Sequence, residues 1–327
     1  MVSAAIVGAG AIGAWLADAL DRAGWRVSML ARGTTLAALR SAGLRVERGG
    51  ESRRSEPTAG PATELGCQDY VFLAVKAQAL PTLAESLQPL IGPQTVVISA
   101  TNGIPWWFFD DFAGPLCDQH LHSVDPTGSQ ARSFPRGRIL GSVVHATARV
   151  LAPAHVQLVA ADRMVIGAPD GHSSNRVAEV AAGLRLGGIN AVVSEGIRQE
   201  IWAKLWGNMN MNPLSALTGS GTAGMLGNPD IRELCLKMMQ EMRECGELLG
   251  LAGAMSAPER IAVTQRLGDF RPSMLADLEA GRPLEVEPQL GAVVEIAGRL
   301  GVAAPFCRAI LGLTRLRASS GSGGART

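Results

Sequence analysis

Short apolar runs alternate with helical patterns along the first half of the chain. The strand-like runs cover residues 4–7, 26–30, 70–75 and 95–100, and stretches rich in alanine and leucine separate them. This alternation is typical of βαβ units, in which helices join parallel strands. It predicts an α/β fold over residues 1–195, with a doubly wound parallel sheet of the Rossmann type.

Two later parts of the chain depart from this alternation. Shorter strand-like pieces predict an antiparallel extension of the sheet at residues 139–144, 155–159 and 164–166. Long helical periods, with proline or glycine near their ends, then occupy residues 196–211, 229–249, 258–267, 288–300 and 304–316. We therefore expect a second, all-helical domain over residues 196–317. The serines and glycines of residues 318–327 predict a flexible tail.

The composition limits the partners of the chain. Apolar residues make up 47% of the 327 residues and charged residues 18%, which is typical of compact domains with a sizeable core. Thirty basic and 29 acidic side chains leave a net charge of +1, so we expect no nucleic acid and no membrane partner. The five cysteines include no Cys-x-x-Cys pair, which argues against disulfides and structural zinc and favours a cytoplasmic location.

The pattern G-x-G-x-x-G follows the first predicted strand and opens a helix. Its residues are Gly8, Ala9, Gly10, Ala11, Ile12 and Gly13. The first glycine permits a tight turn, the second lets a pyrophosphate approach the backbone, and the third lets helix and strand pack closely. The motif predicts a dinucleotide-binding site. The alternative is a turn that only joins the two elements.

The end of the second predicted strand indicates which dinucleotide binds. Enzymes that use NAD place an acidic residue there, but none occurs between Asp21 and Glu47. Arg32 lies there instead, close to Thr34, and a guanidinium suits a phosphate. We therefore expect NADPH as the cofactor, unless Arg32 is only a solvated surface residue.

Lys76 and Asn102 follow the third and fourth predicted strands. Open α/β sheets bind ligands at the carboxyl ends of their strands, so both residues are candidates for ligand contact. Taken singly, residues at such positions are more often part of a turn.

One helix carries a polar stripe. Lys204, Asn208 and Asn212 are spaced four apart and share one face of an otherwise apolar helix. Buried amides and ammonium groups are costly, so the stripe favours a polar cavity in which a lysine of lowered pKa donates a proton to a carbonyl. The alternative is a surface pair of Glu200 with Lys204, and asparagines that cap or kink the helix before Pro213.

Further along the chain, Ser273 supplies a hydroxyl, and three carboxylates are candidates to orient the lysine. They belong to Asp277, Glu279 and Glu285. Spacing alone does not select one of them.

Taken in order, these motifs resemble the ketopantoate reductase family over nearly the whole chain. The resemblance implies reduction of a 2-oxo acid with NADPH, specifically of 2-dehydropantoate to pantoate in pantothenate biosynthesis. It implies that Lys204 is the general acid and that Glu285 holds this lysine and contacts the nascent hydroxyl. The residues that it assigns to the substrate carboxylate and hydroxyls are Asn208, Asn212 and Ser273, and those that it places near the nicotinamide are Lys76 and Asn102.

Two features depart from the family pattern. Relatives often have an asparagine before a Gly-Glu-Leu segment, whereas residues 221–226 contain no amide, so a substrate contact near Thr222 is missing or replaced. An aromatic run also follows Asn102, namely Trp106, Trp107, Phe108 and Phe109. We expect these rings to pack in the core, the alternative being that they reshape the pocket.

Two other functions stay open beside this one. The missing amide favours the same hydride chemistry on a different 2-oxo acid, and a sensor that binds NADPH without chemistry would not need Lys204 or Glu285. The β-hydroxyacid and 6-phosphogluconate dehydrogenases place their lysine in a glycine-rich helix that this chain lacks. Metal ligands are suggested only by Cys117, His120 and His122, and because Rossmann reductases need no metal, we expect none. Relatives are often dimers, which leaves a homodimer open.

Overall fold

The computed structural model describes residues 1–172 and 174–321, which form two compact units. The first unit comprises Met1–Thr101 and Thr127–Glu200. The second comprises Asn102–Pro126 together with the chain from Ile201 onward. The expected division after residue 195 lies just before the helix that leads into the second unit. The expectation did not include Asn102–Pro126 in that unit, and here the structure differs from it.

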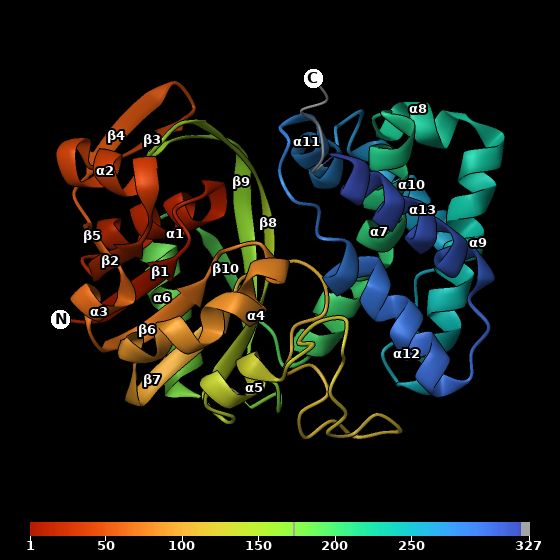
Figure 1. Cartoon of the computed structure of the whole chain (residues 1–327), viewed down its shortest axis with the longest axis horizontal. Helices are drawn as coiled ribbons and strands as arrows, with labels where there is room; N and C mark the ends of the chain where they lie inside the picture. Colours follow the sequence, from red (N-terminus) through yellow and green to blue (C-terminus); the bar gives the residue numbers. More distant parts are fainter. Residues whose placement is uncertain (173, 322–327) are drawn as a thin grey trace. The chain divides into compact units, whose positions relative to one another are not determined.

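Five parallel strands form one side of the sheet in the first unit (Figure 1). They are β1 (Ser3–Val7), β2 (Arg26–Leu30), β5 (Thr58–Gly60), β6 (Gln68–Leu73) and β7 (Ile91–Ser99), in the order β7-β6-β1-β2-β5, with β5 at the edge of the sheet. Every residue of β1 is buried, which is typical of a strand covered on both faces. The winding reverses between β1 and β6, so their carboxyl ends flank the position where such sheets bind ligands. The predicted Rossmann-type fold is confirmed.

A mixed extension completes the ten-stranded sheet. The strands β8 (Ile139–Ala152) and β9 (His155–Gly167) pair antiparallel, as predicted, and β8 continues the sheet parallel to β7. The remaining strands are β3 (Leu44–Arg48), β4 (Glu51–Ser55) and β10 (Asn190–Val193). Both β3 and β10 run parallel to β9, and β4 pairs antiparallel with β3. The strand β8 extends past the predicted end at residue 144. Its second half is partly exposed and carries no continuous apolar run, so the sequence pattern did not predict it as strand.

Two helices pack against each other and against the sheet, namely α1 (Ala11–Arg22) and α6 (Asn175–Leu186). Trp15, Leu16 and Leu20 of α1 and Leu184 of α6 are almost completely buried in this core. The other helices of the first unit are shorter: α2 (Gly33–Ala42), α3 (Ala62–Leu65), α4 (Leu80–Leu83) and α5 (Ser129–Ser133).

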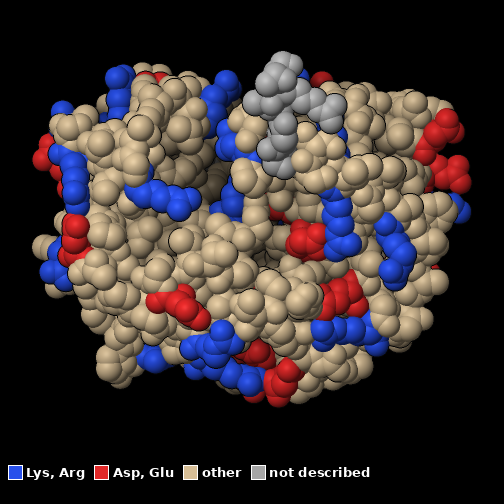
Figure 2. Space-filling view, viewed as in Figure 1, with Lys and Arg blue, Asp and Glu red and all other residues tan. Residues whose placement is uncertain are grey.

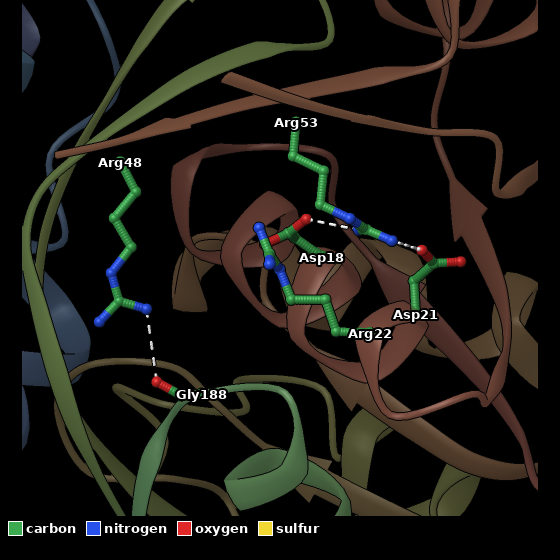
Figure 3. A network of polar contacts seen from close by, with 6 residues as sticks. All are labelled: Asp18, Asp21, Arg22, Arg48, Arg53 and Gly188. Atoms are coloured by element: carbon green, nitrogen blue, oxygen red, sulfur yellow. Dashed lines mark hydrogen bonds and ion pairs between the residues drawn. The ribbon is translucent and has the colours of Figure 1, made fainter. Parts of the chain in front are cut away.

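A cluster of charged side chains joins α1 to the β3–β4 hairpin (Figure 3). Arg53 of β4 donates a hydrogen bond to Asp18 Oδ1 at 2.7 Å and another to Asp21, and Arg22 Nε donates to Asp18 Oδ2 at 2.9 Å. Asp18 is only 7% exposed, so these two guanidinium groups compensate a carboxylate that has lost most of its water. Arg48 of the same hairpin donates to the carbonyl oxygen of Gly188 at 3.4 Å.

The second unit is helical. Its helices are α7 (Ile197–Thr218), which starts in the first unit, α8 (Thr222–Gly227), α9 (Pro229–Leu248), α10 (Ala257–Arg266), α11 (Ser273–Glu279), α12 (Ala292–Leu300) and α13 (Pro305–Gly321). A π-helical turn, Glu287–Gly291, precedes α12. Local sequence signals start two of these helices: the Asn228 side chain caps α9, and Ser256 forms a capping box with Glu259 at α10. None of the described helices has the length and hydropathy needed to cross a membrane.

The aromatic run explains why Asn102–Pro126 belongs to the helical unit. Trp107 and Phe108 are fully buried, and the Phe108 ring stacks on Trp202 of α7 with ring centroids 6.4 Å apart. The backbone N–H groups of His122 and Ser123 donate to the carboxylate of Glu295 on α12 at 2.9 and 2.8 Å. The expected core packing of the aromatic residues is therefore confirmed.

Two helix ends differ from the sequence-based expectation. Helix α7 contains Pro213 and continues to Thr218, so the asparagines do not end it before the proline; Leu214 and Ala216 beyond it are buried in the core. Helix α13 reaches Gly321, four residues into the expected tail, and the Ser319 and Ser320 hydroxyls donate to the carbonyl oxygen of Leu316. Residues 322–327 of that expected tail lie outside the described residues.

Charged side chains of both signs are interspersed on the face shown in Figure 2. This distribution agrees with the near balance of 30 basic and 29 acidic residues in the sequence.

Candidate active site

The glycine turn between β1 and α1 has the geometry that a pyrophosphate-binding turn requires. Gly8 has φ +108°, and a Cβ there would lie 2.8 Å from Val75 Cγ1. A Cβ at Gly13 would collide with the carbonyl oxygen of Gly8. At Gly10, the exposed N-cap residue of α1, a Cβ would meet no atom within 4 Å. Two glycines are therefore required by the chain itself, and the third leaves open space in front of the helix N-terminus.

The other predicted cofactor residues of the first unit lie at the same edge of the sheet. Arg32 follows β2 as the exposed N-cap residue of α2, and Thr34 in the first turn of α2 is exposed as well. Lys76 follows β6 and directly succeeds Val75, the residue in contact with the glycine turn. Ala9, Ala11 and Ile12 are half-buried. In the described part of the chain no carboxylate pairs with Arg32, which keeps its guanidinium free for an anion.

In the second unit a hydrogen bond joins two of the predicted site residues. Lys204 Nζ, on α7, donates to Asn102 Oδ1 at 2.8 Å. The turn that carries Asn102 is held in place by its neighbours: Gly103 has φ +85°, and a Cβ there would collide with the carbonyl oxygen of Pro288. That oxygen accepts a hydrogen bond of 2.8 Å from the backbone N–H of Ile104. Glycine is thus needed to seat Asn102 against the π-helical turn.

Glu285 is the carboxylate that acts on Lys204. Desolvation lowers the pKa of Lys204 to about 8, and the opposite charge of the Glu285 carboxylate, itself only 3% exposed, counteracts part of this effect. The two other candidates are engaged elsewhere, because Asp277 accepts a hydrogen bond from Arg282 Nε at 2.8 Å and Glu279 pairs with Arg271. Of the three carboxylates that the sequence left open, Glu285 is thus the one whose charge acts on Lys204, and its role in holding the lysine stays a prediction.

The remaining predicted substrate residues are placed differently from one another. Asn208 is half-buried, one helical turn from Lys204. Asn212 is only 4% exposed, and its Nδ2 donates to Gln289 Oε1 at 2.7 Å. Ser273 is exposed at the first position of α11. The three polar residues of the stripe thus lie on one helix, α7, but the last of them, Asn212, contacts another side chain of the protein.

Sequence reasoning overlooked two polar residues of this unit. Gln289 is 1% exposed, and its Nε2 has no hydrogen-bond partner among the described residues. Arg260 of α10 packs against Gly207 of α7. Proline near the starts of the predicted helices at residues 258 and 288 indicates helix ends, and no local pattern indicates that either side chain approaches α7.

Two of the suggested metal ligands make contacts within the protein. The His120 ring bonds to the carbonyl oxygen of Asp125, and His122 donates its backbone N–H to Glu295. The third, Cys117, is exposed and forms no disulfide. Within residues 1–172 and 174–321, no three His, Cys, Asp or Glu side chains gather as metal ligands do.

Comparison with known proteins gives matches over nearly the whole chain. The family profile described as ketopantoate reductase PanE/ApbA matches residues 4–171, and that of its C-terminal part matches residues 196–318. The 2-dehydropantoate 2-reductase of Mesorhizobium japonicum is 41% identical over 312 residues, covering 95% of this chain and 96% of the relative. A crystal structure from Ralstonia solanacearum MolK2 has 42% identity and a TM-score of 0.94, with 98% of each chain covered. The 2-dehydropantoate 2-reductase from Methylococcus capsulatus has 25% identity and a TM-score of 0.84, with 99% of each chain covered.

Proposed function

Because this chain belongs to the ketopantoate reductase family of oxidoreductases, we propose that it reduces a 2-oxo acid to the 2-hydroxy acid with hydride from NADPH. The first substrate to consider is 2-dehydropantoate, giving pantoate for pantothenate biosynthesis, since relatives with that name match nearly the whole chain. The hydrogen bond between Lys204 and Asn102 is the observation that carries the proposal. It orients the ammonium group of a lysine whose pKa is lowered, as a proton donor requires.

Lys204 acts as the general acid. Its pKa of about 8 lies near neutral pH, where an acid is both protonated and ready to give up its proton. The amide oxygen of Asn102 fixes the direction of the ammonium group, and the charge of Glu285 keeps it protonated. Lys204 Nζ transfers one proton to the 2-oxo oxygen as the carbonyl carbon accepts the hydride, and solvent then restores the proton on Nζ.

The first unit supplies the cofactor site. NADPH supplies the hydride when it is bound. The glycine turn, with Gly8 and Gly13 required by the backbone and open space at Gly10, suits the pyrophosphate at the N-terminus of α1. Arg32 suits the 2′-phosphate, and no carboxylate follows β2 to bind a 2′-hydroxyl in its place. Lys76 and Asn102 are assigned to the nicotinamide end.

The second unit supplies the groups that bind the substrate. Among the described residues no side-chain hydrogen bond engages Asn208 or Ser273, so both can bind a carboxylate or hydroxyl of the substrate. Asn212, by contrast, is bonded to Gln289. The orphaned Nε2 of Gln289 adds a buried donor beside Asn212.

The test is a panel of 2-oxo acids assayed with NADPH and with NADH, together with Lys204→Ala. We expect turnover of at least one acid with a preference for NADPH, and a loss in kcat of about 100-fold or more in Lys204→Ala. Lys237→Ala, an exposed lysine on α9, is the matched control and should keep full activity. A Lys204→Ala enzyme with normal kcat, or tight binding of NADPH with no turnover of any panel member, contradicts the proposal, and the latter result favours a sensor.

One observation favours a second candidate, the same chemistry on a different 2-oxo acid. Where relatives often have an asparagine, Thr222 is only 1% exposed, and its hydroxyl bonds to the carbonyl oxygens of Gly268 and Phe270 at 3.2 and 3.3 Å. This hydroxyl stabilises a loop of the protein and does not replace the missing amide. A kcat/KM for 2-dehydropantoate far below that for another panel member would favour the second candidate.

A further inference from the structure

The guanidinium of Arg260 lies against the helix that carries Lys204. A Cβ at Gly207 would be 2.9 Å from Arg260 Cζ, so the guanidinium rests on α7 in the space that a side chain at this position would take. Gly207 comes three residues after Lys204, and side chains at this spacing lie on the same side of a helix, with Cβ atoms roughly 5–6 Å apart. Arg260 therefore borders the polar stripe of α7.

Arg260 is half-buried and lacks a counter-charge. Its Nη1 donates to the hydroxyl of Thr264 at 3.0 Å, and no carboxylate of the described residues pairs with it. Desolvation alone lowers the pKa of Arg260, with no opposing attraction from a neighbouring carboxylate. By contrast, Arg243 and Arg299 each bind a glutamate four residues away. A partly desolvated guanidinium with free donors is costly, and an anionic ligand would remove that cost.

Helix α10 carries Arg260 and joins it to the loop that holds Thr222. The loop Gly268 to Phe270 follows α10 directly and holds the Thr222 hydroxyl, and α10 packs against α8. Helix α10 therefore brings a cation to the side of α7 that carries Lys204. A guanidinium favours a charged oxygen on a ligand.

We propose that Arg260 is a substrate-binding residue that pairs with a carboxylate of the 2-oxo acid and so determines which acids are accepted. The inference rests on the proposed function. The carboxylate is either the one beside the reacting carbonyl or a second one at the far end of the molecule, and the two sources are separated by the choice of substrates.

The experiment combines removal of the arginine with removal of the substrate charge. Arg260→Gln is compared with wild type on a monocarboxylic 2-oxo acid, on the amide of that acid and on 2-oxoglutarate. A charge-assisted hydrogen bond predicts a fall in kcat/KM of about 10- to 100-fold, mainly through KM, for the acid that uses Arg260 and at most about threefold for the amide. Arg260→Lys should recover part of the loss. The control, Arg266→Gln, changes an exposed arginine of the same helix.

A loss confined to 2-oxoglutarate assigns the second carboxylate, and a loss on both acids but not on the amide assigns the one beside the carbonyl. An equal loss on all three compounds overturns the proposal, because it indicates a structural role. Calorimetry with oxamate, an unreactive 2-oxo acid analogue, separates this proposal from the proposed function. If wild type turned over no substrate, weaker oxamate binding by Arg260→Gln with unchanged NADPH binding would still support the pairing, and equal oxamate binding by both proteins would overturn it.

Discussion

Replacing Glu285 by glutamine removes the charge that acts on Lys204 and keeps the size of the side chain. Desolvation lowers the pKa of Lys204 to about 8, and Glu285 opposes that effect. A general acid works only while it is protonated, so kcat/KM should fall as the pH rises through about 8 in the wild-type enzyme. Without the carboxylate the ammonium form is less favoured, and the fall should begin at a lower pH.

The size of this displacement follows from the electrostatics of the pair. A nearby opposite charge shifts a pKa by roughly one to three pH units. Because desolvation outweighs Glu285 at Lys204, we use the lower end of this range and expect the midpoint to move from about 8 to about 7. The protonated fraction at pH 8 then decreases about fivefold, which adds to any loss of contact between Glu285 and the substrate.

The assay is the initial rate of NADPH oxidation over roughly pH 6 to 10, at low substrate concentration so that kcat/KM is measured. Glu279→Gln is the matched control, because that glutamate is bound to Arg271 at the surface and its removal should leave the midpoint in place. A midpoint near 8 in Glu285→Gln, even with a lower kcat, would refute the reasoning, since Glu285 would then act on the substrate without affecting the protonation of Lys204.

Three further predictions concern the first unit. Gly13→Ala should destabilise the protein by about 1–3 kcal/mol in thermal unfolding, because its Cβ collides with backbone, whereas Gly10→Ala should keep the Tm and weaken only NADPH binding. Arg32→Ala should raise the KM for NADPH about 10- to 100-fold and leave that for NADH nearly unchanged; equal effects on both would exclude a contact with the 2′-phosphate. Arg53→Ala should lower the free energy of unfolding by about 1–3 kcal/mol, because it leaves a buried carboxylate on α1 short of a partner, while the exposed Arg54→Ala should change it little.

Much of the fold could be predicted from local patterns. The parallel strands are nearly continuous apolar runs, and the glycines of the turn have the conformations and close contacts that the motif requires. The polar face of α7 also follows from spacing alone, because residues four apart share a face in any helix. The roles of Lys204 and Asn208 in catalysis and binding stay predictions.

The remaining features depend on contacts between segments that are distant in the sequence. Glu285 could not be separated from Asp277 and Glu279 until the structure showed that the latter two bind arginines. The contact between Arg260 and Gly207 joins two helices, and neither residue is unusual in its own helix. Such contacts are set by the packing of one helix against another. Hydrophobic periodicity shows which face of a helix is buried but does not show which helix packs against that face.

The division of the second unit into two stretches of sequence has a consequence for the synthesis of the protein. Phe108 is made well before Trp202, on which its ring stacks, and at roughly 5–20 residues per second the delay is about 5–20 s. During that time the ribosome-bound chain presents an aromatic segment without its final neighbours, which makes it a binding site for chaperones and a starting point for aggregation. A recombinant fragment that stops before α7 would carry the same exposed segment permanently, so simple truncation cannot produce the first unit without that segment.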